Sequence, residues 1–307
     1  MGGLMRHATT AARVASERSE LWPPGALSWL AFLGWLPFAA VVPGPPDEAQ
    51  LTFFGAGLVV SGAWPYNAVL LTLAAMGVVL AAFGVAALGE AALRAELVAG
   101  VRRAWWPAVR RIMAIRLVAA APAAVGVVAL LLGVAAVAPA EFSSPDIGGS
   151  VPARIAMRIA PLIVIALVLV LGSQAWAASA ERRGAAGGPV LDGLRDGMRQ
   201  LRARPLVAGV VVTTTFLVRC LYLAGAALLL AVLWSPIGAM LVSGGGFDAE
   251  SALLLVGFVA IWLCLVLGGG AMQAWASAWW TLELDSLPIT LRTRSVPPET
   301  AQGLRAP

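Results

Sequence analysis

Six long apolar runs constrain the fold of this chain more than any other feature of its sequence. Crossing the hydrocarbon layer of a bilayer takes about 20 consecutive apolar residues. With 60% hydrophobic and only 12% charged residues, the chain is also far from the composition of a soluble domain. The sequence therefore predicts an all-α integral membrane protein with six transmembrane helices, at about residues 22–42, 66–89, 117–138, 159–180, 206–234 and 252–281.

The segments that join the apolar runs are too short to bury a separate soluble core. We therefore expect a single six-span membrane domain over residues 22–290. A cytoplasmic tail with a weak amphipathic helix, 1–21, is expected before it, and a disordered cytoplasmic tail, 291–307, after it. The first apolar run is too long for the hydrophobic region of a cleaved signal peptide, so we interpret it as a signal anchor.

The arginines indicate how the spans are oriented, because short cytoplasmic loops carry an excess of basic residues. Of the 21 arginines, 18 lie in the two tails and in the segments after the second and fourth spans. The opposite loops carry Arg154, Arg158 and six carboxylates. The sequence predicts a multi-pass protein of a bacterial-type cytoplasmic (inner) membrane with both termini in the cytoplasm. Its net charge of +5 suits anionic lipid headgroups and does not require nucleic acid as a partner.

Two Arg-rich stretches, at about 91–111 and 189–204, have the pattern of interfacial amphipathic helices. In the second stretch Leu191, Leu194 and Met198 recur at helical spacing, and charged residues take the other face. Together with the N-terminal helix, these stretches predict three repeats of one interfacial helix followed by two spans. The arginines expected to contact headgroups are Arg102, Arg103, Arg110, Arg111, Arg195, Arg199 and Arg202.

The tetrapeptide Gln-Ala-Trp-Ala occurs twice, beginning at Gln174 and at Gln273, and each copy closes a long apolar run. We expect Trp176 and Trp275 to lie at the level of the inner headgroups, where tryptophan is enriched. The two glutamines can each form a hydrogen bond to a neighbouring span, and the small residues around them allow helices to approach closely.

The alternation of span pairs with Arg-rich helices, the stretch LDGLRDGMRQLRARPLVAGV and the stretch QAWASAWWTLELDSLP resemble a known membrane domain. This is the six-span domain of membrane-anchored glycerophosphodiester phosphodiesterases, which related uncharacterised prokaryotic membrane proteins carry alone. The resemblance covers nearly all of residues 1–290 and implies the same architecture. The phosphodiesterases carry their chemistry in a separate soluble barrel without a counterpart in this sequence, so the resemblance implies no phosphodiesterase activity.

Several residue types needed for catalysis are missing from the predicted spans. The chain has no lysine, which excludes a P-loop, a kinase lysine and a Schiff base. Its one histidine, His7, is in the N-terminal tail, and no Asp or Glu lies inside a predicted span. The cysteines, Cys220 and Cys264, are isolated and suggest neither a disulfide nor a metal site. We expect a protein that is not an enzyme and has no metal or other cofactor.

Arg219 lies near the middle of the fifth predicted span, where an arginine costs at least about 3 kcal/mol and is usually functional. Thr215 and Tyr222, at i−4 and i+3, share its face of the helix. Three kinds of partner are compatible with this position of Arg219: backbone carbonyls freed near Pro122 or Pro161, a lipid phosphate, or an anionic substrate. Alternatively, a shift or tilt of this long run lets Arg219 snorkel toward one interface.

Two functions from different classes are compatible with these features. The sequence favours a non-catalytic scaffold or accessory subunit of a larger membrane complex, which organises other membrane proteins or anionic lipid. The alternative is a small permease or lipid-handling carrier with an anionic ligand near Arg219. A wet cavity that contains Arg219, Thr215 and Gln174 or Gln273 favours the carrier, and a closed bundle with an apolar outer groove favours the accessory role. The ligand candidates are Arg219, Thr215, Tyr222, Gln174 and Gln273.

Overall fold

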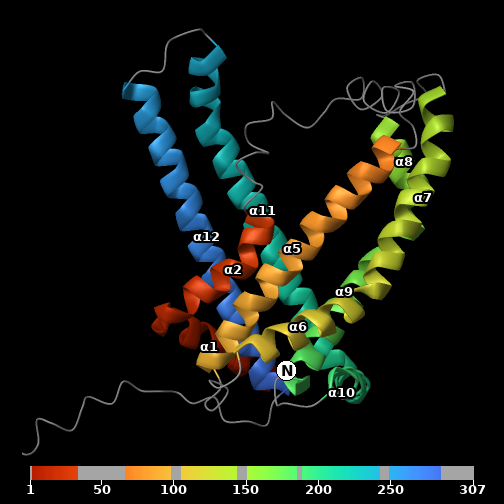
Figure 1. The fold of residues 1–307 in the computed structure, drawn as a ribbon, viewed down its shortest axis with the longest axis vertical. Helices are drawn as coiled ribbons and strands as arrows, with labels where there is room; N and C mark the ends of the chain where they lie inside the picture. Colours follow the sequence, from red (N-terminus) through yellow and green to blue (C-terminus); the bar gives the residue numbers. More distant parts are fainter. Residues whose placement is uncertain are drawn as a thin grey trace, which may run out of the picture.

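The computed structural model describes residues 2–33, 66–97, 105–143, 151–184, 189–242 and 249–284, and all regular structure in these ranges is helical. Figure 1 shows how the helices are arranged. In chain order they are α1 (Gly2–Glu17), η1 (Ser19–Leu21), α2 (Trp22–Leu33), α5 (Tyr66–Leu97), α6 (Trp105–Ala119), α7 (Ala121–Ser143), α8 (Val151–Arg158), α9 (Ala160–Gly184), α10 (Val190–Ala203), α11 (Pro205–Val242) and α12 (Ala249–Leu284).

Three of the described helices are long and apolar enough to cross a membrane. They are α9, α11 and α12, whose membrane-length segments have mean hydropathies of 2.1, 2.3 and 2.6. The pair α6 and α7, bent by 42° at a short break, would make a fourth span if it crosses as one unit. The all-helical class expected from the sequence is therefore confirmed for the described residues, and their composition is compatible with an integral membrane protein.

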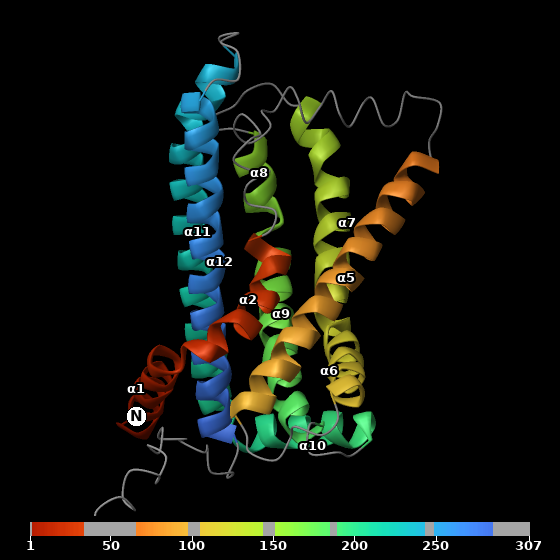
Figure 2. The ribbon, with the colours of Figure 1, turned by 60° about the vertical axis from the view of Figure 1, so that its left-hand side comes forward.

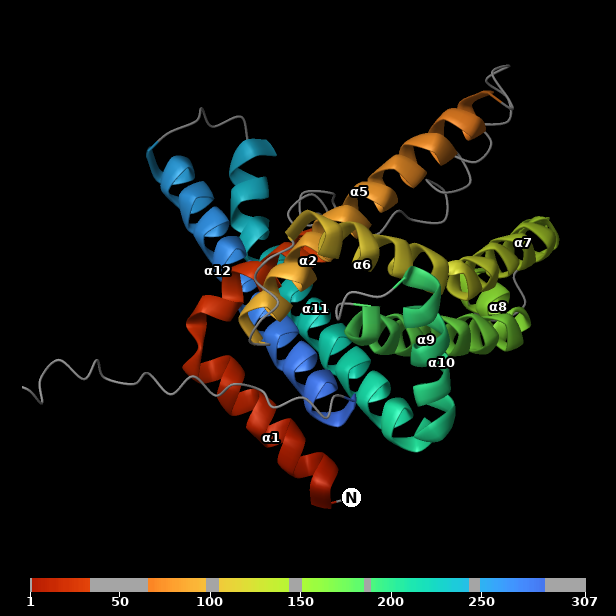
Figure 3. The ribbon, with the colours of Figure 1, turned by 60° about the horizontal axis from the view of Figure 1, so that its bottom comes forward.

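The helices form three arms that come together at one end of the molecule (Figures 1, 2 and 3). The arms are the pair α11 and α12, the pair α7 and α9, and α5. The short helices α1, α6 and α10 lie around the end where the arms meet, which we call the joined end. Toward the opposite end the arms diverge.

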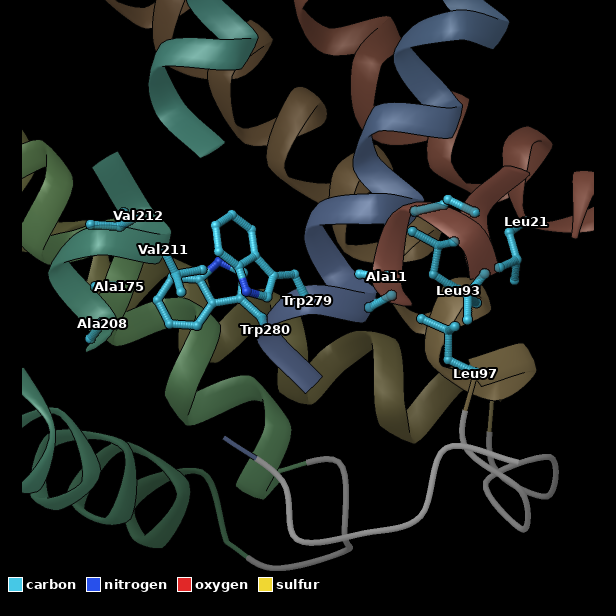
Figure 4. Packing of buried hydrophobic residues seen from close by; sticks show 14 residues of the cluster. Ala11, Leu21, Leu93, Leu97, Ala175, Ala208, Val211, Val212, Trp279 and Trp280 are labelled. Carbon is cyan, nitrogen blue, oxygen red and sulfur yellow. The ribbon is translucent and has the colours of Figure 1, made fainter. Parts of the chain in front are cut away.

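A cluster of buried hydrophobic residues holds the joined end together (Figure 4). Trp279 and Trp280 of α12 pack with Val211 of α11, Leu93 of α5 and Ala11 of α1. Away from this cluster the arms expose many leucine and valine side chains, as helices that face lipid do. Packing is therefore concentrated where the arms meet.

A glycine in each of two helices lets α2 cross α12 with their backbones in direct contact. A Cβ atom added to Gly270 would collide with the backbone oxygen of Trp22, and one added to Gly25 would collide with that of Gly270. Gly268 lies against the hydroxyl of Tyr222. Gly268 and Gly270 are therefore sites of close helix packing.

The bend between α6 and α7 leaves a backbone amide that a neighbouring helix satisfies. Pro122 has no N–H group and interrupts the helical hydrogen bonds. The N–H group of Ala123 donates to Ser173 Oγ of α9, at 3.1 Å. This contact joins the two helices of one arm. The sequence-based hypothesis that carbonyls freed near Pro122 hold Arg219 is not what the structure shows, since Arg219 bonds to α12.

The structure differs from the predicted interfacial helix at 91–111. Helix α5 continues to Leu97, and a separate helix, α6, begins at Trp105. The physical reason is that Arg94 is buried and paired inside the protein, so α5 extends past the predicted end of its span. Residues 34–42 of the first predicted span, Arg102, Arg103 and the tail 291–307 lie outside the described residues.

The glycine crossing gives a direct test of the packing. We expect Gly270→Ala to lower the free energy of unfolding by about 1–3 kcal/mol, because the new methyl group overpacks a backbone contact. Gly257→Ala in the same helix is the matched control, since nothing lies within 4 Å of its Cβ position. Thermal unfolding in detergent measures both. Equal melting temperatures for the two variants would contradict the crossing.

Candidate functional site

Two glutamates and two arginines from three helices form a buried ion-pair network at the joined end. Arg94 Nη2 of α5 lies 2.8 Å from Glu181 Oε2 of α9, and Arg116 Nε of α6 lies 2.6 Å from Glu181 Oε1. Glu90 of α5 lies 3.3 Å from Arg94 Nε and 3.8 Å from Arg116 Nη2. The side chains of Glu90, Arg94 and Glu181 are at most 5% exposed. Each carboxylate therefore contacts two guanidinium groups.

Small neighbouring residues explain why these charges are buried. Glu90 and Arg94 are four residues apart on α5, which places them on the same face of the helix. Alanines and glycine surround them in the stretch Ala87 to Ala95, and Glu181 follows a similar small-residue stretch in α9. Small side chains let the helices approach closely, so the charged groups are enclosed between them.

The network continues to Arg219 through the side-chain amide of Gln273. Arg219 Nη2 of α11 donates to Gln273 Oε1 at 2.6 Å, and Gln273 Nε2 donates to Glu90 Oε2 at 3.0 Å. Ser277, one turn further along α12, donates to Glu90 Oε1 at 2.7 Å. Because no Asp or Glu lies inside a predicted span, the sequence predicts no carboxylate partner for Arg219 within the membrane. The structure corrects this expectation, because one glutamine links Arg219 to Glu90.

A cavity of about 620 Å³ lies beside this network, enclosed by α2, α5, α9, α11, α12 and the junction of α6 and α7. Arg219, Thr215, Gln174 and Gln273, four of the five ligand candidates taken from the sequence, line it. Other polar side chains of the wall are Ser28, Glu90, Arg116, Ser173, Glu181, Arg182 and Ser277. The volume is in the range of small-molecule sites in proteins, about 300–1,000 Å³.

Two of the candidate side chains also form hydrogen bonds with the helix backbone. Thr215 lines the cavity, but its hydroxyl donates to the carbonyl of Val211 in its own helix, at 2.8 Å. The Tyr222 hydroxyl donates to the carbonyl of Leu265 at 2.6 Å, and this residue is not part of the cavity wall. Tyr222 therefore joins α11 to α12.

The two Gln-Ala-Trp-Ala copies have equivalent positions in the structure. Gln174 and Gln273 both line the cavity. Trp176 Nε1 donates to the Leu194 carbonyl of α10 at 2.9 Å, and Trp275 Nε1 donates to a carbonyl of α1 at 3.2 Å. Each tryptophan, expected from sequence to anchor at the headgroups, thus binds an amphipathic helix to the bundle.

The basic residues assigned to headgroup contacts are separate from the cavity wall. Arg195, Arg199 and Arg202 are exposed on α10, whose opposite face packs against α9 through Leu194. On α6, Arg110 is exposed and Arg111 is partly buried. Arg199 pairs with Asp196 at 3.3 Å in an exposed position. These side chains form a basic face at the joined end.

Arg182 was not singled out by the sequence analysis, nor were Glu90, Glu181, Arg94 and Arg116. Arg182 Nη2 donates to the Ser277 carbonyl of α12 at 2.9 Å, and its guanidinium lies 5.9 Å from the Trp280 ring. The sequence feature that could have identified these buried charges is their position in small-residue stretches at the ends of apolar runs. Such charges can belong either to a loop or to a helix that continues.

The charges at the cavity wall do not cancel. Among the described residues of the wall there are three arginines, Arg116, Arg182 and Arg219, and two glutamates, Glu90 and Glu181, which leaves an excess of positive charge. In a site of low dielectric constant, an anion between like charges is stabilised more than it is in water. The arrangement is suited to binding an anionic group.

No family model matches this chain, and no characterised protein or solved structure compared with it matches either. The functional interpretation therefore depends on the geometry of this site.

The buried network predicts a large difference between two acidic residues. We expect Glu181→Gln to destabilise the protein by about 3–5 kcal/mol, because it removes the carboxylate that makes the closest contacts with Arg94 and Arg116 and leaves their positive charges with Glu90 alone. Asp196→Asn removes an exposed pair and should cost less than about 1 kcal/mol. Chemical unfolding in detergent, followed by circular dichroism, compares them. Similar midpoints for both variants would show that the network contributes little to stability.

Proposed function

We propose that this protein is a membrane permease or carrier that binds an anionic ligand in the cavity beside Arg219. The observation that supports this most is the cavity itself, whose wall combines Arg219, Gln273, Gln174 and Thr215 with an excess of positive charge. Among the described residues Arg219 has one hydrogen bond, to the side-chain amide that links it to Glu90, although a guanidinium has five N–H donors.

The scaffold or accessory role, favoured by the sequence, depended on a closed bundle with its charge at the surface. The exposed arginines of α10 support contact with anionic headgroups, which is compatible with either role. The cavity favours the carrier. Catalysis is not part of the proposal, and neither is a cofactor. The resemblance to the membrane domain of glycerophosphodiester phosphodiesterases supports only a proposal about the arrangement of the spans.

For the membrane arrangement, we propose six spans built as three repeats, with both termini on the cytoplasmic side of an inner membrane. Three short helices support the repeat, because α6 and α10 directly precede α7 and α11, and α1 precedes α2 with only η1 between them. All three lie around the joined end, which carries the exposed arginines of α10 (Figure 2). Basic residues mark the cytoplasmic side, so the joined end would face the cytoplasm.

The role of Arg219 can be measured by native mass spectrometry of the protein released from nanodiscs. We expect the wild type to retain an anionic ligand that Arg219→Gln loses, with occupancy reduced about tenfold, as for the loss of one charge-assisted contact. Arg219→Lys should retain part of the binding, because it keeps the charge. Arg158→Gln is the control for removing an arginine, since that side chain pairs with Glu141 outside the cavity wall.

Two results would decide against this function. A ligand retained equally by the wild type and Arg219→Gln would show that Arg219 does not bind it. A stoichiometric partner protein that co-purifies with both, with no bound anion, would support the accessory role instead.

The proposed topology has its own test. We expect alkaline phosphatase fused after residues 48, 147 or 247 to be active, and the same enzyme fused after residues 100, 187 or 290 to be inactive, because it folds only outside the cytoplasm. If the fusions on both sides of one predicted span are active, that segment does not cross the membrane.

A further inference from the structure

The cavity beside Arg219 is chemically different along its length. Its charged side chains come from residues close to the joined end, such as Glu90 of α5 and Glu181 of α9. Farther along the same helices the wall becomes apolar, with Phe83 and Val78 on α5 and Val170 on α9. A small hydrophilic anion would make no favourable contact with this apolar part of the wall.

The length of the cavity can be estimated from the helix geometry. Val78 and Glu90 both line the cavity and are 12 residues apart on α5, which corresponds to about 18 Å of helix rise. The lining residues of α9 extend from Val170 to Arg182, also about 18 Å along that helix. The cavity therefore runs along the helices and matches an elongated molecule with its charge at one end.

The apolar part is also open at the side of the protein. Val78 lines the cavity and is nevertheless 44% exposed, and Cys220 of α11 lines it and is exposed. These residues belong to α5 and α11, two arms that diverge away from the joined end (Figure 2). A surface in this position faces lipid chains if the arms cross a membrane, so a molecule already in the bilayer can reach the cavity laterally.

The direction of the charge gradient agrees with this access. In the proposed topology the joined end faces the cytoplasm, so the charged part of the cavity lies on the cytoplasmic side. A lipid of the inner leaflet has its headgroup on that side and its chains toward the middle of the bilayer. It would occupy the cavity in its ordinary orientation, with its headgroup between Arg219 and Arg116.

We infer that the ligand is an anionic lipid, whose phosphate binds the Arg219–Gln273–Arg116 region and whose chains extend along the apolar wall into the bilayer. This inference rests on the proposed function, since it names the class of ligand for the same cavity. It adds two requirements to the proposed function: the ligand must carry an apolar chain, and it must reach the cavity laterally from the bilayer.

The test compares three probes on the full-length protein by native mass spectrometry in detergent. Phosphatidylglycerol and phosphatidylcholine with identical chains differ in net charge, and glycerol 3-phosphate carries the anionic group without chains. We expect phosphatidylglycerol to bind the wild type at least about tenfold more tightly than either of the other probes. Arg219→Gln should remove this preference.

A substitution in the apolar part separates the two proposals. Ala82 lines the cavity, and its neighbour Ala81 is exposed and not part of the wall. We expect Ala82→Phe to weaken phosphatidylglycerol binding about tenfold, because the ring fills the chain site, and Ala81→Phe to leave it unchanged. If glycerol 3-phosphate binds as tightly as the lipid, is lost in Arg219→Gln and is unaffected by Ala82→Phe, the proposed function stands and the lipid inference fails. If no anionic probe binds the wild type, both fail.

Thiol labelling gives a second measurement, which leaves Arg219 and Ala82 unchanged. Cys220 lines the cavity, whereas Cys264 is exposed on α12 and does not. We expect phosphatidylglycerol to slow the reaction of Cys220 with N-ethylmaleimide severalfold in Cys264→Ser protein, and to leave Cys264 unaffected in Cys220→Ser protein. Equal effects on both thiols, or none on Cys220, would contradict the occupied cavity.

Discussion

The carboxylate of Glu90 is enclosed among α5, α6 and α12, and the arrangement at the joined end depends on how its charge is balanced. Arg94 and Arg116 contact it, and Ser277 and Gln273 donate hydrogen bonds to it. Removing charges from water costs several kcal/mol per ion, which only well-placed partners offset. The contacts of this one group therefore fix the relative positions of α5, α6 and α12. The same contacts place Arg219 at the cavity wall, because Gln273 binds both side chains.

The amphipathic helices and the cavity are connected through the two Gln-Ala-Trp-Ala copies. In each copy the glutamine and the tryptophan, two residues apart, point to different neighbours. The glutamine side chains line the cavity, while the tryptophans bind α10 and α1 through backbone carbonyls. Each copy therefore connects an amphipathic helix to the cavity wall within a single turn of helix. This gives the repeated tetrapeptide a physical reason that anchoring at the headgroups does not supply.

Sequence reasoning was most successful where a property is local. The helical class follows from apolar runs of membrane length, and Gln273 was expected to bond to a neighbouring span, as it does with Arg219. It was least successful for the buried charges. Glu90 and Arg94 were assigned to the end of a span and to an interfacial helix, because burial of a charge depends on partners from other helices. Nothing in the residues around Glu90 identifies Gln273, 183 positions away, as one of them.

The sequence by itself determined that the chain forms long apolar helices, that its arginines are asymmetrically distributed and that Arg219 requires a polar partner. These properties follow from the bilayer, because unpaired backbone groups and charges cost free energy in hydrocarbon wherever they occur in the chain. Only the tertiary structure decided which partners meet. The cavity exists because the arms diverge from a tightly packed end where Gly25 and Gly270 bring two backbones into contact. Such a space depends on the angles between helices, which arise from contacts between residues far apart in sequence.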